Sequence, residues 1–178
     1  MSDVTTGEIV SFWRNAGPDK WFEKDEAFDR AVRSKFLAVH EAAGRGELSV
    51  WEDGAEGALA LVILLDQFPR NMFRGSPRAF ATDPLARAVA ARAIACGFDR
   101  ATDETMRIFF YMPFMHSEAL ADQDRCVALF AGAGHSDYAT SHRDIIAKFG
   151  RFPHRNRVLG RDSTPAEQEF LAGGGFAG

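Results

Sequence analysis

Four residues in mostly apolar stretches carry the side chains that acid–base chemistry uses. Asp66 lies in LLDQFPRN, and His116 and Glu118 lie two positions apart in FFYMPFMHSEAL. His142 falls on the apolar stripe of a predicted helix. A carboxylate or an imidazole within hydrogen-bonding reach of a reacting group can act as a general base or acid. Asp66, His116, Glu118 and His142 are therefore the candidate catalytic residues.

A second set of residues could bind an anion. The stretch FGRFPHRNRVLGR, residues 149–161, holds four arginines between hydrophobic anchors. Guanidinium groups bind carboxylate or phosphate through two parallel hydrogen bonds. Residues 142–161 carry six basic side chains and one acid, although the whole chain has a net charge of −4. Such a local positive patch suits a small anion or an acidic face of the same protein. The candidate ligand-binding residues are Arg70, Asn71, Gln123, Arg151, His154, Arg155, Asn156 and Arg161.

Each of these residues also has a structural interpretation. Asp66 could close a helix end by pairing with Arg70, and Glu118 could lie in the first turn of a helix that Ser117 caps. His142 could be a hydrogen-bonded core residue, and the loop arginines could bind helix-terminal carbonyls and partner acids. Burying an acid without a partner costs several kcal/mol, so we expect both acids to pair with an arginine or histidine. We expect one arginine of the 149–161 loop to pair internally and another to face a ligand.

The elements that must position these residues are predicted to be helices. Apolar residues recur with helical spacing almost throughout the chain. Proline at a first helical position and capping residues mark several helix starts, with Asp83 as one N-cap. Pro69 is expected to follow the end of a helix, and Pro113 is expected to break or kink one. The predicted helices cover residues 6–15, about 25–43, 55–68, 84–96, 103–111 and 117–131, a helix carrying Tyr138, His142, Ile145, Ile146 and Phe149 on one face, and a last helix from the capping box Thr164–Glu167.

The predicted fold is all-α, with seven to eight antiparallel-packed helices. The length of 178 residues fits one domain with a sizeable core. We expect a single helical domain over residues 1–172. The glycine-rich residues 173–178 are expected to form a flexible tail.

Composition and missing motifs exclude several functional classes. The negative net charge argues against general nucleic-acid binding. The longest apolar run has eight residues, far fewer than the roughly 20 of a membrane span, and the N-terminus has no signal-peptide pattern. Cys96 and Cys126 lie among apolar residues, and buried reduced thiols in a cytoplasmic protein are expected. No phosphate-binding or dinucleotide-binding glycine motif occurs, so no cofactor is expected. The irregular spacing of His116, His142 and His154 predicts no metal site.

Four long segments resemble a known family. WFEKDEAFDRAVRSKF, LLDQFPRNMFRGSPRAFATDPLA, FFYMPFMHSEALADQ and KFGRFPHRNRVLGRDSTPAEQEFL are similar to successive signature segments of a bacterial family known only as domain of unknown function number nine-two-four. The resemblance runs from about Ile9 to Leu171. It implies an all-helical fold similar to the tetratricopeptide-repeat-like superfamily, a right-handed helical array. The 34-residue repeat signature of such arrays is absent, and the resemblance implies no activity.

Two functions remain open at this point. In the first, the polar residues converge on a site for a small anionic metabolite, with hydrolysis or group transfer as its chemistry. In the second, the helical surface binds a protein partner and the polar residues form an internal structural network. A concave site lined by the named residues favours the first function, and a large exposed apolar groove favours the second.

Overall fold

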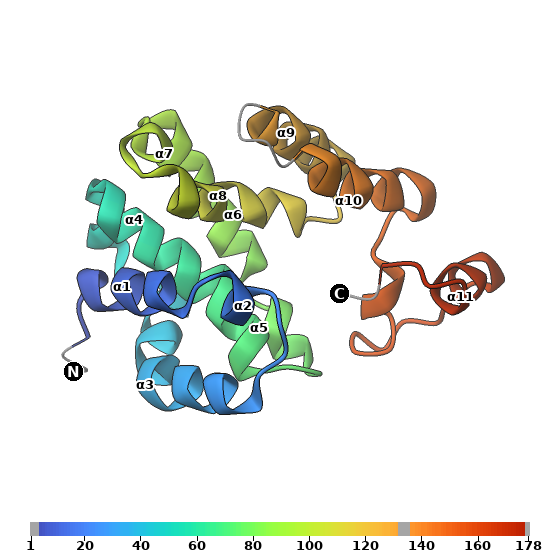
Figure 1. Cartoon of the computed structure of the whole chain (residues 1–178), viewed down its shortest axis with the longest axis horizontal. Coiled ribbons are helices and arrows are strands. Elements are labelled where there is room, and N and C mark those ends of the chain that lie inside the picture. Colours follow the sequence, from blue (N-terminus) through green and yellow to red (C-terminus); the bar gives the residue numbers. More distant parts are fainter. Residues whose placement is uncertain (1–3, 132–135, 177–178) are drawn as a thin grey trace. The chain divides into compact units, whose positions relative to one another are not determined.

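A computed structural model describes residues 4–131 and 136–176, and every regular element in that part of the chain is a helix (Figure 1). The predicted all-α class is confirmed. The chain forms two compact units. The N-terminal unit comprises the residues up to Arg74 and from Arg78 to Pro113, and the C-terminal unit comprises Gly75–Pro77 and the chain from Phe114 onward. The tetratricopeptide-like arrangement and the single domain over 1–172 stay predictions. Residues 177 and 178 of the expected tail lie outside the described residues.

The N-terminal unit is built from short and medium-length helices. They contain almost all of the strongly buried aliphatic side chains. The last two residues of its final helix, Phe114 and Met115, belong to the C-terminal unit. The elements are α1 (Thr6–Ala16), α2 (Pro18–Trp21), α3 (Glu26–Gly44), η1 (Ser49–Asp53), α4 (Ala55–Val62), the π-helical η2 (Ile63–Gln67), α5 (Phe68–Met72), η3 (Pro77–Phe80, of which Pro77 belongs to the C-terminal unit), α6 (Asp83–Ala95), α7 (Phe98–Ala101) and α8 (Glu104–Met115).

The centre of this unit is α4 with η2. Residues 58–65 are apolar on all sides and are at most 3% exposed, because α4 packs against α1, α6 and α7. Trp13 lies edge-on to Phe68 and Phe109, with ring centroids 5.6 and 5.7 Å away. A fully buried large apolar side chain contributes about 1.5–3 kcal/mol. Gly57 is required where α4 meets η1, since a Cβ there would lie 2.2 Å from the carbonyl oxygen of Trp51.

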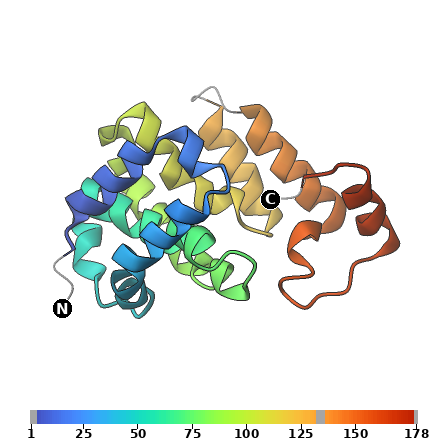
Figure 2. The ribbon, with the colours of Figure 1, turned by 60° about the horizontal axis from the view of Figure 1, so that its bottom comes forward.

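The C-terminal unit contains α9 (Leu120–Phe130), α10 (Ser136–Phe149), the single 3-10 turn η4 (Pro153–Arg155) and α11 (Pro165–Ala172). Helices α9 and α10 lie side by side in both ribbon views (Figures 1 and 2), and η4 packs against α11. A small core of Ile145, Ile146 and Phe152 holds the unit together. Helix α11 begins at the predicted capping box, in which Thr164 and Glu167 cap each other's backbone.

Three predicted helix boundaries were wrong. Pro69 does not end the buried helix, because the chain continues through η2 into α5. Pro69 lies at the start of α5, where the missing N–H of a proline is tolerated. The helix predicted to end at residue 111, where Pro113 would break or kink it, instead runs to Met115 with Pro113 inside it. Its neighbours Phe110 and Phe114 are at most 2% exposed, and this burial outweighs the lost backbone hydrogen bond. Asp83 is the first residue of α6 rather than its N-cap, which is Thr82.

The start of α9 also differs from the prediction. Its N-cap is Ala119 and its first residue is Leu120, so Ser117 and Glu118 precede the helix. The Ser117 hydroxyl instead accepts from the Ala119 amide and donates to Asp122. Tyr138, predicted to lie on the same face as His142, is 55% exposed, because it lies in the first turn of α10. Cys126 is buried as predicted, whereas Cys96 is exposed.

Candidate functional site

In the N-terminal unit, Asp66 is fully buried and shares a guanidinium with a second acid. Arg70 Nη1 lies 3.3 Å from Asp66 Oδ1 and donates to the Asp66 carbonyl oxygen at 2.5 Å. The same guanidinium donates twice to Asp83, at 2.9 and 3.0 Å. Gln67 Nε2 donates to Asp66 Oδ2 at 2.5 Å. The predicted pairing of Asp66 with Arg70 is confirmed, and Arg70 acts here as an internal counter-charge.

The π-helical turn of η2 places Asp66 and Gln67 together in the core. Such turns are often found at functional sites. One turn further, Asn71 donates to Asp29 Oδ1 at 2.8 Å, and Arg74 donates to both oxygens of the same carboxylate. Asn71 therefore links α5 to α3, so its observed contact is structural.

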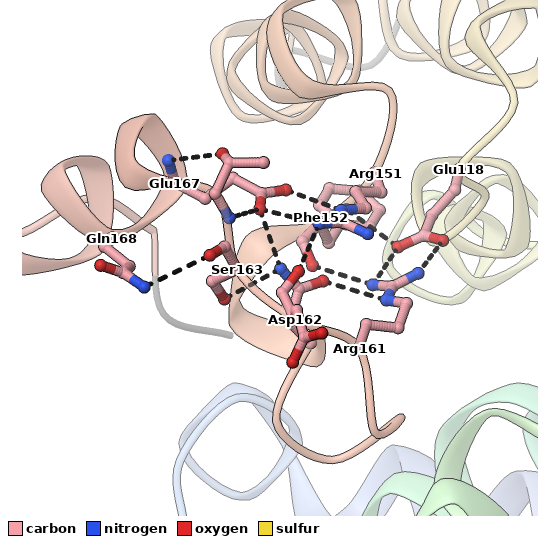
Figure 3. A network of polar contacts seen from close by, with 10 residues as sticks. Glu118, Arg151, Phe152, Arg161, Asp162, Ser163, Glu167 and Gln168 are labelled. Atoms are coloured by element: carbon pink, nitrogen blue, oxygen red, sulfur yellow. Dashed lines mark hydrogen bonds and ion pairs between the residues drawn. The ribbon is translucent and has the colours of Figure 1, made fainter.

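In the C-terminal unit, Glu118 lies in the segment between α8 and α9 and contacts the loop after α10 (Figure 3). Arg161 donates to its two oxygens at 2.7 and 3.0 Å, and the Phe152 amide donates at 2.8 Å. Burial raises the pKa of Glu118, but the hydrogen bonds from Arg161 and the Phe152 amide outweigh it, so the pKa lies below its ordinary value. Glu118 is thus an ionised partner of the loop, as its predicted pairing requires.

A second carboxylate, Glu167 of α11, holds the other end of this loop. Arg151 donates to both its oxygens, at 2.7 and 2.8 Å, and also to the Asp162 carbonyl. The Arg151 hydrogen bonds are the main reason that the pKa of Glu167 falls to about 2. Asn156 donates to Glu167 and accepts from Arg161 Nε at 3.0 Å. We call Glu118, Arg161, Asn156, Glu167 and Arg151 the loop network. The Asn156 side chain joins its two ion pairs, and Figure 3 shows both of these pairs.

Gln123 closes the end of α8. Its side chain is fully buried, and Nε2 donates to the carbonyl oxygens of Met115 and Ser117 at 2.7 and 2.6 Å. The last carbonyls of a helix have no partner within the helix, so this amide supplies a missing donor. Gln123 thereby fixes the segment that carries His116 and Glu118.

His142 is 5% exposed and hydrogen-bonded, as its position on the apolar face of α10 predicts. Its Nδ1 lies 2.9 Å from the Tyr138 carbonyl oxygen. Desolvation lowers the pKa of His142 to about 4 against the opposing effect of that hydrogen bond, and His116 and Arg155 lower it further. The imidazole is therefore neutral at pH 7, with the proton on Nδ1 and a lone pair on Nε2.

His154 lies in the same unit, on the loop after α10. Its ring centroid is 5.5 Å from that of Phe152, and its buried Nδ1 has no hydrogen-bond partner among the described residues. Arg155 Nη1 donates to the His116 carbonyl oxygen at 3.0 Å, and its guanidinium lies 4.5 Å from the centre of the Phe152 ring. Burial, then the charge of Arg155, lowers the pKa of His154 to about 4. We call His142, His154, Arg155 and the adjoining His116 the histidine cluster.

The predicted site residues divide between the two units. Asp66, Arg70 and Asn71 belong to the N-terminal unit, and the convergence of Asp66 with the others stays a prediction. The C-terminal unit brings together His116, Glu118, Gln123, His142, Arg151, His154, Arg155, Asn156 and Arg161. The described residues contain no group of three or more His, Cys, Asp or Glu side chains that could hold a metal ion.

Sequence reasoning missed two residues of this unit. Glu167 was recognised only as part of a capping box, although the same carboxylate is the partner of Arg151. Phe176 was assigned to a tail, although its ring packs on His142. The isolated aromatic residue in AGGGFAG was the available signal.

Comparison with known proteins finds similarity over most of the chain. The model of a family described as "Bacterial protein of unknown function (DUF924)" matches residues 9–175. A solved structure of a protein of unknown function from Agrobacterium tumefaciens is 52% identical and superposes with a TM-score of 0.91, covering 93% of this chain and 96% of that chain. No curated protein matches the chain. Within the described residues, none of the helices has both the length and the apolar character of a membrane span.

Proposed function

Because the chain belongs to this bacterial family of unknown function, whose description carries no activity, we propose a function from the geometry alone. The C-terminal unit binds a small anionic metabolite at the histidine cluster. The observation that supports this proposal is the buried Nδ1 of His154, which has no hydrogen-bond partner among the described residues and lies close to the Arg155 charge.

An unsatisfied buried nitrogen is costly. Leaving a buried donor or acceptor without a partner costs about 1–3 kcal/mol, and native proteins rarely keep such groups without water or a ligand. Arg155 already disfavours protonation of both His142 and His154. An anion at this place would offset that repulsion, accept a hydrogen bond from His154 and raise the pKa of both imidazoles.

The loop network supplies the rigidity that such a site needs. Arg151 and Arg161 each hold a carboxylate with two hydrogen bonds, so the backbone on both sides of His154 and Arg155 is fixed. A site that is ordered before binding loses less entropy when the ligand arrives. The two outer arginines are thus supports, and Arg155 with His154 provides the groups that bind the anion.

The cluster also holds a group suited to acid–base chemistry. The neutral His142 presents the lone pair of Nε2, which is the form that a general base requires. Hydrolysis or group transfer on the bound anion is the enzymatic form of the proposal, with His142 as the base. In the binding-only form, the same nitrogen accepts a hydrogen bond from a partly protonated oxyanion such as hydrogen phosphate.

Titration of the histidine ring signals with inorganic phosphate tests the binding step. We expect saturable shifts of the His142 and His154 signals and an increase of both pKa values in the wild type. These changes should be absent in His154→Phe. Arg157→Ala is the matched control, because Arg157 is an exposed arginine of the same loop. Wild-type signals that stay unchanged in tens of millimolar phosphate, together with an unchanged melting temperature, contradict the proposal.

A second candidate function is a protein-interaction module without chemistry. The observation that favours it is the pairing of Arg151 with Glu167 and of Arg161 with Glu118. Two of the four arginines of the loop are thereby neutralised by acids of the same unit instead of by a ligand. In that case the loop network is internal and the phosphate titration is silent. The two functions therefore give opposite results in the same experiment.

A further inference from the structure

The ring of Phe176 contacts both imidazoles of the histidine cluster. Its centroid lies 4.5 Å from that of His142 and 5.2 Å from that of His154, with interplanar angles of 63° and 80°. Tyr138 adds a third edge-on contact at 6.4 Å. Both imidazoles also contact Phe152, which is fully buried. The cluster therefore contains a defined position for one aromatic ring, lined by two histidines.

The segment that delivers this ring is attached by backbone hydrogen bonds and by the Phe176 ring. Residues 173–175 are glycines, which bury no side chain. Their amides donate to the carbonyl oxygens of Glu169, Leu171 and Phe170 at the end of α11, and Gly174 adopts a positive φ of 80° that favours glycine. Three successive glycines gain conformational freedom when released. The ring contacts of Phe176 are thus the main side-chain attachment of this segment.

We propose that Phe176 occupies the position of an aromatic ring of the ligand, so that the histidine cluster takes an aromatic oxyanion, such as an aryl phosphate, which displaces the C-terminal segment. This inference rests on the proposed anion site. An aryl phosphate recovers the ring contacts that Phe176 gives up and adds an oxyanion beside His154 and Arg155. Inorganic phosphate adds only the oxyanion and has no ring to exchange with Phe176.

The geometry of the ring contacts supports this exchange. Edge-to-face contacts between aromatic rings contribute about 0.5–1.5 kcal/mol beyond buried area, and an aryl ring can make them with the same imidazoles. Hydrogen bonds from His154 and Arg155 to the oxyanion are charge-assisted and add directionality. The ring selects aromatic ligands, and the imidazoles with the guanidinium select anionic ones.

The test compares phenyl phosphate with inorganic phosphate on wild type and Phe176→Ala, by calorimetry and by the histidine ring signals. Removing the competing ring should tighten phenyl phosphate binding by about 2- to 12-fold, which corresponds to the ring-contact free energy. The affinity for inorganic phosphate should differ by less than about 2-fold between the wild type and Phe176→Ala. Phe22→Ala is the matched control, since Phe22 is a 59% exposed phenylalanine of the N-terminal unit.

The outcomes separate this inference from the function on which it rests. If both phosphates bind but Phe176→Ala changes neither affinity, the assignment of Phe176 to the ring position is wrong and the anion site stands. If neither compound binds to either protein, the anion site itself is wrong. If Phe176→Ala does not fold, Phe176→Leu replaces it, because leucine keeps an apolar side chain without the aromatic ring. The preference of this variant for phenyl phosphate over inorganic phosphate is expected to be larger than that of the wild type.

Discussion

The guanidinium of Arg161 holds the carboxylate of Glu118 with two hydrogen bonds of 2.7 and 3.0 Å, although the two residues stand 43 positions apart. Neither side chain is fully buried, at 24% and 28% exposure. The pair ties the segment before α9 to the loop before α11. Together with the Phe152 amide, it accounts for the lowered pKa of Glu118.

Arg161→Ala is predicted to lower the free energy of unfolding by about 1–3 kcal/mol, because Glu118 loses its charged partner while half-buried. The value lies below the cost for a fully buried pair because solvent screens these side chains. Urea denaturation measures the difference. Arg157→Ala, at an exposed position of the same loop, should change stability by less than about 0.5 kcal/mol. Equal effects of the two substitutions contradict the structural role of Arg161.

Arg70→Ala is predicted to be more damaging, by about 3–5 kcal/mol, since two buried carboxylates lose the guanidinium that they share. The side chains of Asp66 and Asp83 are 0% and 8% exposed. Arg74→Ala is the matched control, because Arg74 is 40% exposed and its pair with Asp29 should contribute about 1 kcal/mol or less. Guanidinium chloride denaturation compares them, and an Arg70 variant as stable as the Arg74 variant disproves the assignment.

Gln123→Ala is predicted to cost about 1–3 kcal/mol by leaving the buried carbonyls of Met115 and Ser117 without their donor. Thermal denaturation gives the magnitude, and hydrogen exchange near the end of α8 shows the local loosening. Gln168→Ala serves for comparison, because Gln168 is exposed and donates to one carbonyl oxygen. A Gln123 variant with wild-type stability argues against the capping role.

The stability of the wild type is predicted to fall as pH drops from about 6.5 to about 4, the range between the unfolded and folded pKa values of His142. The folded state disfavours the imidazolium form of His142. The contribution of this residue to the free energy of unfolding is therefore complete above the unfolded pKa and is lost at lower pH, as protons bind the unfolded chain. Burial is the main reason that the pKa of His142 is low, and the charged or titratable groups His116 and Arg155 lower it further. His142→Gln should reduce the slope of this part of the pH profile, and His154, whose folded pKa is also about 4, accounts for a further share of it. A ring titration midpoint near 6.5 for His142 in the folded protein rules the prediction out.

Local patterns predicted much of the fold. Helical spacing of apolar residues located most helices, the capping box at Thr164 located the start of α11, and the face shared with Ile145 and Ile146 predicted the burial of His142. These features depend on residues within a few positions of one another, which is the range that a sequence pattern reports.

Features that depend on distant residues were not predictable in the same way. The helix continues through Pro113 because burial of its aromatic neighbours outweighs a lost hydrogen bond, and that burial comes from other elements. The loop contains four arginines with identical side chains, so the sequence alone does not indicate which acid each of them binds. The course of the loop, with positive φ angles at Gly150 and Gly160, decides that Arg161 reaches Glu118 and Arg151 reaches Glu167.

The separation between Glu118 and Arg161 also sets an interval during synthesis. Chains grow by about 5–20 residues per second, so the arginine is added roughly 2–9 s after the glutamate. Throughout that interval the nascent chain carries a carboxylate whose guanidinium partner does not yet exist, and water must solvate it. The contacts that hold the Glu118 carboxylate therefore form only after the loop that follows α10 has been made.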